Sequence, residues 1–417
     1  MRSFIIFAKP TIFRRMLNDI NEKIKAFNKG RYPETLTLKY KLMREDKFRF
    51  LRATTHLFYE DIPPGSFLYN SPYAWICGDM HLENLGSYKA DNRIAYFNVN
   101  DFDECLLAPC LLDTYRLIIS VIVSSSNLEL SASDTNSLCS LYIDKYLDTL
   151  QQGYIRTLEK QTSRGVIKKF LKNVAQRKRK EFLKAHTFRK NDNYRLIIAQ
   201  PHTLPLSDSK KEEVIGQIAK WAKQKQDSDF YKVHDVAFRI AGTSSLGMDR
   251  YVILVEGRGA PNGAFLLDLK ETAPSCAAKH VPSKQPVWKD DAERLIEVQK
   301  RMLSAPPALL ADIRIGKKAF ILKELQPTAD RIDYTMFKGN TKKLKNMLED
   351  MASISAWDTL RTGGRQGSAI ADEFIYFAKN SQKLKKNLLE AAFKYCDTID
   401  LYHKSYCKAY DKGYYKL

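Results

Sequence analysis

One acidic segment, residues 78–104, constrains this chain more than any other stretch. It reads GDMHLENLGSYKADNRIAYFNVNDFDE, with its acids in two groups on either side of the apolar run 94–99. This spacing predicts two adjacent loops joined by a short hairpin, with carboxylates converging on one point. Carboxylates and an Asn are oxygen ligands suited to a hard cation such as Mg²⁺, which commonly binds together with phosphate. The segment therefore predicts a Mg²⁺ site beside a phosphate group.

Composition sets the broad class of protein. The chain has 417 residues and 44% hydrophobic content, which is enough for two or three lobes with an apolar core. The sequence contains no stretch of 18 uncharged apolar residues, so no membrane span is predicted. The start at 1–16 is interpreted as the first ordered segment rather than a signal peptide. Seven cysteines without a C-x-x-C pair predict free thiols in a reducing compartment. We expect the cytoplasm, and leave delivery into another cell open.

The charge is strongly basic. A formal net charge of +20 predicts attraction to polyanions, whether nucleic acid, anionic membrane, nucleotide or inositol phosphates. The densest basic run, Lys168–Arg195, has partial helical spacing of its apolar residues. It is either a solvated basic helix face or a patch that faces phosphate or lipid. Sequence-specific nucleic-acid binding is not expected.

The pattern along the chain predicts an α+β fold. Short apolar runs separated by turns predict strands between residues 67 and 99 and again from 232 to 326. Apolar residues at helical spacing predict helices elsewhere, namely at 12–60 with a break near 31–33, 111–123, 137–158, 290–303 and 338–417 with an interruption at RTGGRQG.

The strand-rich region carries a second candidate site. RIAGTSSLGMDRYVILVEG predicts a strand, a loop bounded by Gly242 and Gly247, and a second strand. Such a loop can bring backbone N–H groups close to phosphate oxygens, although a simple tight hairpin has the same pattern. The next strand ends with Lys270, which could reach under the loop, and the helix that follows carries Glu293 and Glu297, either of which could pair with that Lys. Taken singly, these are also ordinary positions for a surface Lys and a solvated Glu.

The order of these elements is informative. A Gly-containing hairpin, a strand Lys, a helix Glu and a strand leading into a linker at Leu325 form the phosphate-handling half of a protein-kinase-like site. The acidic segment matches the other half. Asp79 takes the place of the catalytic base, and Asn84 and Asp101 take those of the metal ligands. His81 could hold the loop by bonding a carbonyl, while Glu83, Asp103 and Glu104 serve loop solvation or secondary metal support.

These motifs resemble a known family. GDMHLENLG, NDFDE, LLDTYRLIIS and DVAFRIAGTSSLGMDRYVILVEG are similar to the bacterial family named domain of unknown function 2252, over roughly residues 39–410. That family is grouped with protein-kinase-like and aminoglycoside-phosphotransferase-like folds, which implies a bilobal fold. The resemblance implies Asp79 as base and makes Asp113 and Arg116 structural. The implied metal ligands are Asn84, Asp101 and Asp103. The implied nucleotide-binding residues are Lys270, Glu297, Gly242, Thr243, Ser244, Ser245, Gly247 and Leu325.

The implied lobes are permuted relative to ordinary kinases, because the catalytic and metal loops precede the hairpin and its Lys. The expected domains are 1–231 with the catalytic loops and basic region, 232–326 for the nucleotide, and 327–417 completing the catalytic lobe. One nucleotide can span both halves only if Lys270 lies within about 10 Å of Asp101. Domain termini often lie close together, so a permuted order is physically acceptable.

The expected activity is transfer of the γ-phosphoryl group of ATP, with Mg²⁺, to a hydroxyl. The acceptor is left open between an anionic small molecule, a lipid headgroup and a protein. Two alternatives stay open. One is a non-catalytic kinase-like protein that holds a polyanion on its basic surface, and the other is a nucleotidyl transferase that uses the same residues with the nucleotide reversed. A dinuclear phosphoesterase, suggested by GDMH, is disfavoured because the seven His residues lack the context of metal ligands.

Overall fold

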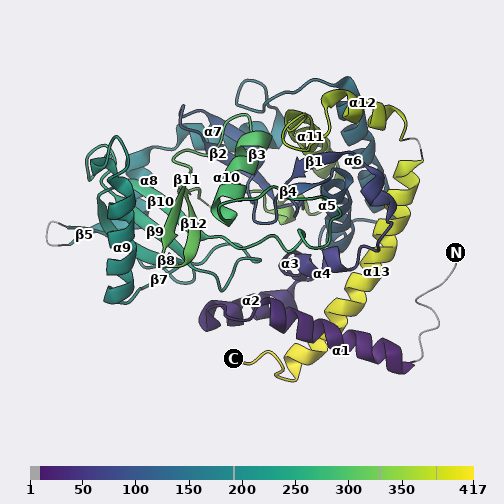
Figure 1. The fold of residues 1–417 in the computed structure, drawn as a ribbon, viewed down its shortest axis with the longest axis horizontal. Helices are drawn as coiled ribbons and strands as arrows, with labels where there is room; N and C mark the ends of the chain where they lie inside the picture. The colour runs from purple at the N-terminus through teal and green to yellow at the C-terminus, as the bar shows by residue number, and fades with distance from the viewer. Residues whose placement is uncertain (1–9, 191–192, 328–329, 382) are drawn as a thin grey trace.

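The computed structural model describes residues 10–190, 193–327, 330–381 and 383–417. The expectation for the start of the chain lies largely outside these residues. The fold is α+β, as predicted, with a helical part and a strand-rich part side by side along the long axis of the molecule (Figure 1). In the described ranges, no helix is both long and apolar enough to cross a membrane. All seven cysteines are free thiols, as expected.

The helical part is built around α5, in which every residue except Ile122 is buried. Helices α3, α6 and α13 pack against it, and α1 packs on α13, so the first and last helices lie together (Figure 1). The helix predicted at 137–158 ends earlier, because Gly153 adopts a left-handed φ of 71° at its C-terminus. The helices are α1 (Pro10–Phe27), α2 (Pro33–Glu45), α3 (Lys47–Ala53), α4 (Thr55–Glu60), η1 (Phe67–Asn70), α5 (Leu111–Ser124), α6 (Ala132–Gln152), η4 (Tyr334–Phe337), α11 (Thr341–Arg361), α12 (Ala371–Lys379) and α13 (Leu384–Asp411).

The acidic segment forms the predicted hairpin between two loops. Strands β2 (Leu85–Lys89) and β3 (Ala95–Val99) pair antiparallel, and β1 (Tyr73–Ile76) pairs with β4 (Leu106–Pro109) around them. The two loops therefore leave adjacent strands and run side by side. Gly78 marks their closest approach, since a Cβ there would lie 2.1 Å from the Glu104 carbonyl oxygen.

The main sheet has six antiparallel strands in the order β11-β12-β10-β9-β8-β7. The four strands predicted after residue 232 are present as β8, β9, β10 and β12, and β7 and β11 extend the sheet. On β10, Leu267 and Leu269 belong to an apolar cluster that includes Val214 and Ile218 of α9. The alternate residue Lys270 therefore faces the helical part. The elements are β7 (Thr203–Leu204), α9 (Asp208–Ala222), η2 (Asp229–Tyr231), β8 (Val233–Arg239), β9 (Arg250–Val255), β10 (Phe265–Glu271), β11 (Ala311–Ile315) and β12 (Lys318–Glu324).

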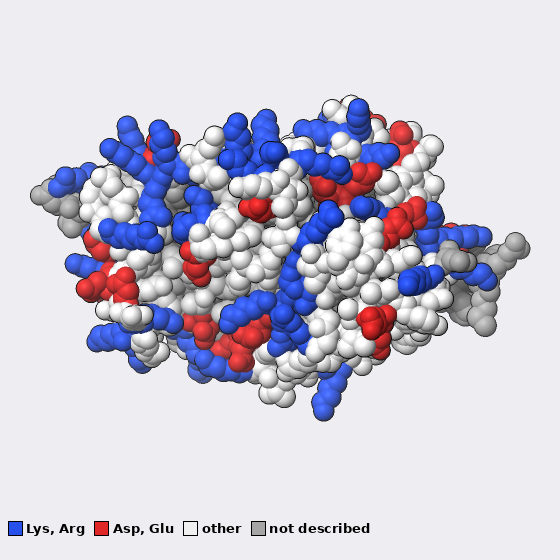
Figure 2. Space-filling view, turned by 90° about the horizontal axis from the view of Figure 1, so that it is seen from above, with Lys and Arg blue, Asp and Glu red and all other residues white. Residues whose placement is uncertain are grey.

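Helices α7 (Gly165–Gln176) and α10 (Asp291–Met302) lie where the two parts meet (Figure 1). Helix α7 buries Ile167, Leu171 and Val174 against the β2–β3 hairpin and turns its lysines outward. Lys and Arg gather on the face of the molecule that carries α7 and α8 (Figure 2). The remaining elements are α8 (Arg179–His186), β5 (Thr187–Lys190) and β6 (Asn193–Leu196).

The first exit of the chain from the helical part and its last return lie at two places that touch, and between them residues such as Ala277, Val281 and Leu295 also pack into the helical core. The chain leaves the helical part after α7 and returns after β12. Arg177, at the exit, donates two hydrogen bonds to Asp330, at the return, with N···O distances of 2.7 and 2.5 Å. The two connections are therefore joined by a bidentate ion pair.

Candidate active site

Residues of helix α5 hold Asp79, which lies in the loop between β1 and β2. The Asp113 carboxylate accepts hydrogen bonds from the backbone N–H groups of Cys77 (2.9 Å) and Gly78 (3.0 Å). Arg116, one turn further along α5, donates from Nε to Asp79 Oδ1 at 2.6 Å. The second oxygen, Oδ2, accepts no hydrogen bond from the described residues, and the side chain is 15% exposed. Asp79 is thus oriented through one oxygen and keeps the other available.

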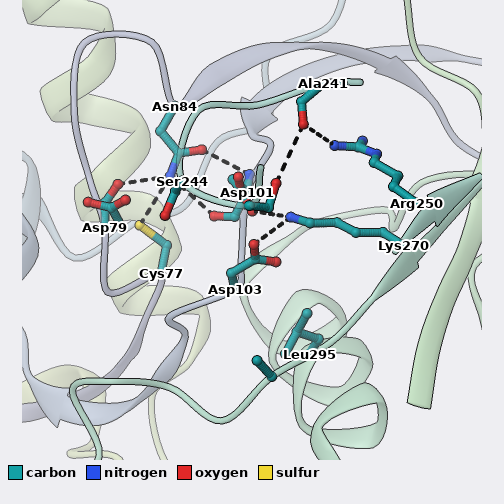
Figure 3. Close-up of polar contacts among 12 residues, drawn as sticks. Cys77, Asp79, Asn84, Asp101, Asp103, Ala241, Ser244, Arg250, Lys270 and Leu295 are labelled. Atoms are coloured by element: carbon teal, nitrogen blue, oxygen red, sulfur yellow. Dashed lines mark hydrogen bonds and ion pairs between the residues drawn. The ribbon is translucent and has the colours of Figure 1, made fainter. Parts of the chain in front are cut away.

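Asn84 joins the two acidic loops. Its Nδ2 donates to the carbonyl oxygens of Asp79 (3.0 Å) and Asp101 (3.2 Å), and its Oδ1 accepts from the Asp101 N–H at 2.8 Å (Figure 3). The side chain is buried. Because an amide oxygen has a second lone pair, Oδ1 retains capacity for one more partner, such as a cation.

The other side chains of the acidic segment anchor the loops. His81 is buried, and its Nδ1 accepts from the Glu83 N–H at 3.1 Å, so it bonds an amide rather than the expected carbonyl. Glu83 pairs with Arg52. Glu104 Oε2 accepts from the N–H of Cys276 at 2.7 Å and ties the loop to the segment after β10.

Lys270 brings the sheet and the acidic loops into one site. Its Nζ lies 3.2 Å from Asp101 Oδ1 and 2.5 Å from Asp103 Oδ2, well within the distance that a shared nucleotide requires (Figure 3). Burial raises the pKa of Asp101, but the nearby Lys270 and Arg331 charges outweigh burial and hold it below its usual range. Burial and the Asp101 charge raise the pKa of Asp103. The two acids thus share one cation and differ in their affinity for a proton.

Glu297 does not pair with Lys270. It forms an ion pair with Lys300 at 2.9 Å on the outer face of α10, while Leu295 and Gln299 face Lys270. The helix is rotated relative to the expected orientation because Arg294 points inward. Arg294 donates to the carbonyl oxygens of Asp103 (3.1 Å), Cys105 (2.6 Å) and Ala273 (2.8 Å). Sequence reasoning missed Arg294, since nothing in its local pattern separates it from a solvated helix Arg.

Several carbonyl groups of the hairpin loop between β8 and β9 accept hydrogen bonds from basic side chains. Arg31 donates to the carbonyl oxygens of Ser244 (2.6 Å) and Leu246 (3.0 Å), and buried Lys39 donates to Ser244 at 2.8 Å. By contrast, the backbone N–H groups of residues 242–247 donate to no atom of the chain as described. Gly242 and Gly247 have left-handed φ values of 79° and 91°, which allow this turn. Unpaired amides bounded by such residues are suited to an anion. The side chains of Thr243 and Ser245 are buried.

Further cations line the face of the sheet beside Lys270. Asp268 is neutralised by Arg250, which donates at 2.5 Å, and by Arg239, whose Nη1 lies 2.8 Å away. Lys323 forms no hydrogen bond or ion pair with the described residues, and burial and the nearby Arg331 charge lower its pKa to about 8. The Nε of Arg331 is buried and has no hydrogen-bond partner among the described residues. These cations exceed the acids around the same small cavity, which favours an anionic ligand.

The oxygen donors of this site fit a metal ion that is held partly by the protein and partly by the phosphates of a bound substrate. Within the described ranges, no group of three or more His, Cys, Asp or Glu side chains is arranged to hold a metal alone. Mg²⁺ in nucleotide sites is commonly held by one or two carboxylates, waters and substrate phosphates. Asp101, Asp103 and the free lone pair of Asn84 match that partial set.

Leu325 is buried where the linker leaves the sheet. Its N–H donates to the Leu266 carbonyl oxygen at 2.8 Å, so this amide is already paired. Leu325 therefore lines the neighbouring cavity with its side chain.

Comparison with known proteins identifies the family to which this chain belongs. No curated protein and no solved structure matches the chain. A family model matches residues 31–409, which is most of the sequence. The motifs of the acidic loops, the hairpin and Lys270 all lie within that range. The chain therefore belongs to the family described as an uncharacterized protein conserved in bacteria, DUF2252.

Proposed function

We propose that this protein is a Mg²⁺-dependent, kinase-like phosphotransferase that moves the γ-phosphoryl group of ATP to a hydroxyl. The observation that carries the proposal is the contact of Lys270 with Asp101 and Asp103, which unites two segments about 170 residues apart. The order of hairpin, strand Lys, helix, two strands and linker supports it, since protein kinases use this order around their nucleotide phosphates.

Each residue then has a defined role. Asp79 accepts the proton of the acceptor hydroxyl. The oxygen of that hydroxyl bonds to the γ-phosphorus while the bond between the γ-phosphorus and the β–γ bridging oxygen breaks, which releases ADP. Arg116 orients Asp79. Asp101, Asp103 and Asn84 would hold Mg²⁺, which neutralises phosphate charge when bound. Lys270 and the open amides of residues 242–247 would bind phosphate oxygens.

The acceptor class is a further proposal. The net charge of +20 and the basic face around α7 and α8 favour an anionic acceptor or surface. An anionic small molecule, a lipid headgroup and an acidic protein all meet this requirement.

One observation favours nucleotidyl transfer as the second candidate. Arg239, Arg250 and Lys323 occupy the sheet face toward the linker, where an ordinary kinase would place an apolar base pocket. A reversed nucleotide would direct its phosphates toward these cations, and the acceptor oxygen would then attack the α-phosphorus and release pyrophosphate. The mass added to the product distinguishes the two reactions.

Calorimetric titration of Mg²⁺–ATP tests the shared site. We expect binding to wild-type protein and loss of its Mg²⁺-dependent part in Asp101→Ala and Lys270→Ala. Glu297→Gln is the matched control on α10 and should bind as wild type does, because its side chain pairs with Lys300 on the outer face. Absence of binding by folded wild-type protein would sink the proposal and favour a non-catalytic scaffold.

A further inference from the structure

A cavity of about 160 Å³ lies beside the linker, outside the cluster around Lys270. It is bounded by the end of β2, by α7 and α8, and by the end of β12. We call it the linker cavity. Its cationic lining residues are Lys89, Arg93, Arg177, Arg179 and Lys323.

The charges of the linker cavity are unbalanced. Its two carboxylates are both committed, because Arg93 binds Glu324 through two hydrogen bonds (2.6 and 2.9 Å) and Arg177 binds Asp330 in the same way. The other three cations, Lys89, Arg179 and Lys323, form no ion pair with any described residue. Arg179 lies over the Phe265 ring at 3.6 Å, a contact that leaves its positive charge without a counterion. Three cations thus surround one cavity without matching acids.

We infer that the linker cavity is a binding site for the phosphate group of a small molecule. Arg179 offers a planar fork and the two lysines offer point charges, which together suit phosphate oxygens. Val174, Phe182 and Leu325 add apolar walls that can contact the organic part of the ligand. Burial lowers the pKa of each of the three unpaired cations, and an anion among them would offset this cost.

The site adjoins the proposed active site through Lys323, which lines both cavities. Phosphate binding at the linker cavity does not require the proposed function. Only the source of the phosphate is tied to a function: the acceptor of the proposed phosphotransferase could carry it, or the distal phosphates of the reversed nucleotide in the nucleotidyl-transfer alternative could occupy it. Both sources share one chemistry.

Calorimetric titration with inorganic pyrophosphate, without Mg²⁺, tests the inference. We expect Arg179→Gln and Lys89→Gln to weaken binding by about tenfold or more, since each removes a charge-assisted contact. Arg365→Gln and Lys386→Gln remove the same charge from exposed positions elsewhere and should change binding by less than about twofold. If Arg179→Gln is poorly folded, Arg179→Lys takes its place in the comparison. The Lys variant keeps the positive charge and should retain most of the affinity for pyrophosphate.

Three outcomes would overturn the inference. They are no binding by wild-type protein, equal weakening in the exposed controls, and loss of binding in Lys270→Met while Arg179→Gln binds normally. Competition identifies the source: mutual exclusion of pyrophosphate and Mg²⁺–ATP supports the nucleotide's distal phosphates, whereas simultaneous binding supports the acceptor's phosphate. Pyrophosphate binding without any Mg²⁺–ATP binding would refute the proposed phosphotransferase and leave the anion site standing.

Discussion

Arg116 and Asp79 form a 2.6 Å ion pair in which the cation is almost wholly buried and the acid is partly open. Arg116 also donates to the Leu51 carbonyl oxygen at 3.0 Å and to Thr55 Oγ1 at 2.8 Å. The guanidinium is therefore held by two hydrogen bonds besides its contact with Asp79. A residue expected to be structural thus sets the direction of the proposed base.

Replacing Arg116 with Lys should lower kcat by about 10- to 100-fold, because a Lys keeps the charge but cannot reproduce the fixed fork. The affinity for Mg²⁺–ATP should stay near that of wild type, since Arg116 contacts only Asp79 in the site. Steady-state ATP turnover and calorimetry measure the two quantities. Thr55→Val, which removes one hydrogen bond to Arg116, should give a smaller loss. An unchanged kcat in folded Arg116→Lys would show that Asp79 needs no orientation.

Gly78→Ala should destabilise the fold by more than about 2 kcal/mol and separate the two acidic loops. The added Cβ would lie 2.1 Å from the Glu104 carbonyl oxygen, at a φ of 77°. Gly65→Ala is a matched control, because its φ of 78° imposes similar strain with no atom within 4 Å of the new Cβ. Urea unfolding of both variants isolates the cost of the clash. Equal losses of stability would mean that the loops can move apart freely.

Arg294→Gln should cost about 1 to 3 kcal/mol, because it removes the donor from three carbonyl oxygens, including that of buried Cys105. It should also weaken Mg²⁺–ATP binding, since Arg294 holds the backbone of Asp103. Glu297→Gln, one turn away, should change stability by less than about 0.5 kcal/mol, as expected for an exposed ion pair. Thermal unfolding and calorimetry report both effects. Similar behaviour of the two variants would contradict the observed rotation of α10.

His56 should make the fold sensitive to acid. Its ring stacks on Phe27 with centroids 4.0 Å apart, and both ring nitrogens are buried with no hydrogen-bond partner in the part of the chain that the structure describes. Burial and the charges of Lys39 and Arg31 lower its pKa from 6.5 to about 3. Because the folded pKa lies below the unfolded one, the unfolded chain binds the proton first as pH falls below 6.5. Through this residue, the free energy of unfolding should fall by about 2 kcal/mol near pH 5.

His56→Phe keeps an aromatic ring against Phe27 and removes the titrating group. Its unfolding free energy should therefore fall less than that of wild type between about pH 7 and pH 5, by roughly the amount assigned to His56. Urea unfolding at the two pH values measures the difference. The same pH dependence in both proteins would show that His56 takes up a proton within the fold.

The parts of the site that could be predicted from sequence are those fixed by short spacing. Asp79, Asn84 and Asp101 lie on two loops joined by one hairpin, so local pattern is enough to bring them together. Lys270 was expected from the order of elements. The partner of Lys270 could not be predicted, because the face that α10 turns inward depends on the distant carbonyl groups that Arg294 binds.

The anchors of the hairpin loop were missed for the same reason. Arg31 and Lys39 lie more than 200 residues before Ser244 and show no local pattern that marks a loop contact. The helix predicted to 158 was too long, because one Gly ended it where apolar spacing continued. The existence of elements follows from local periodicity, whereas their relative rotation follows from tertiary contacts.

The bidentate pair between Arg177 and Asp330 has a consequence for how such a protein can be assembled. The strand-rich unit enters and leaves the helical part at one point, so its removal or insertion would leave the surrounding chain nearly closed. Where a module has adjacent ends, its position in the gene is independent of its position in the fold. The late position of Lys270 in the sequence then carries no structural penalty, and its side chain still reaches Asp101 and Asp103.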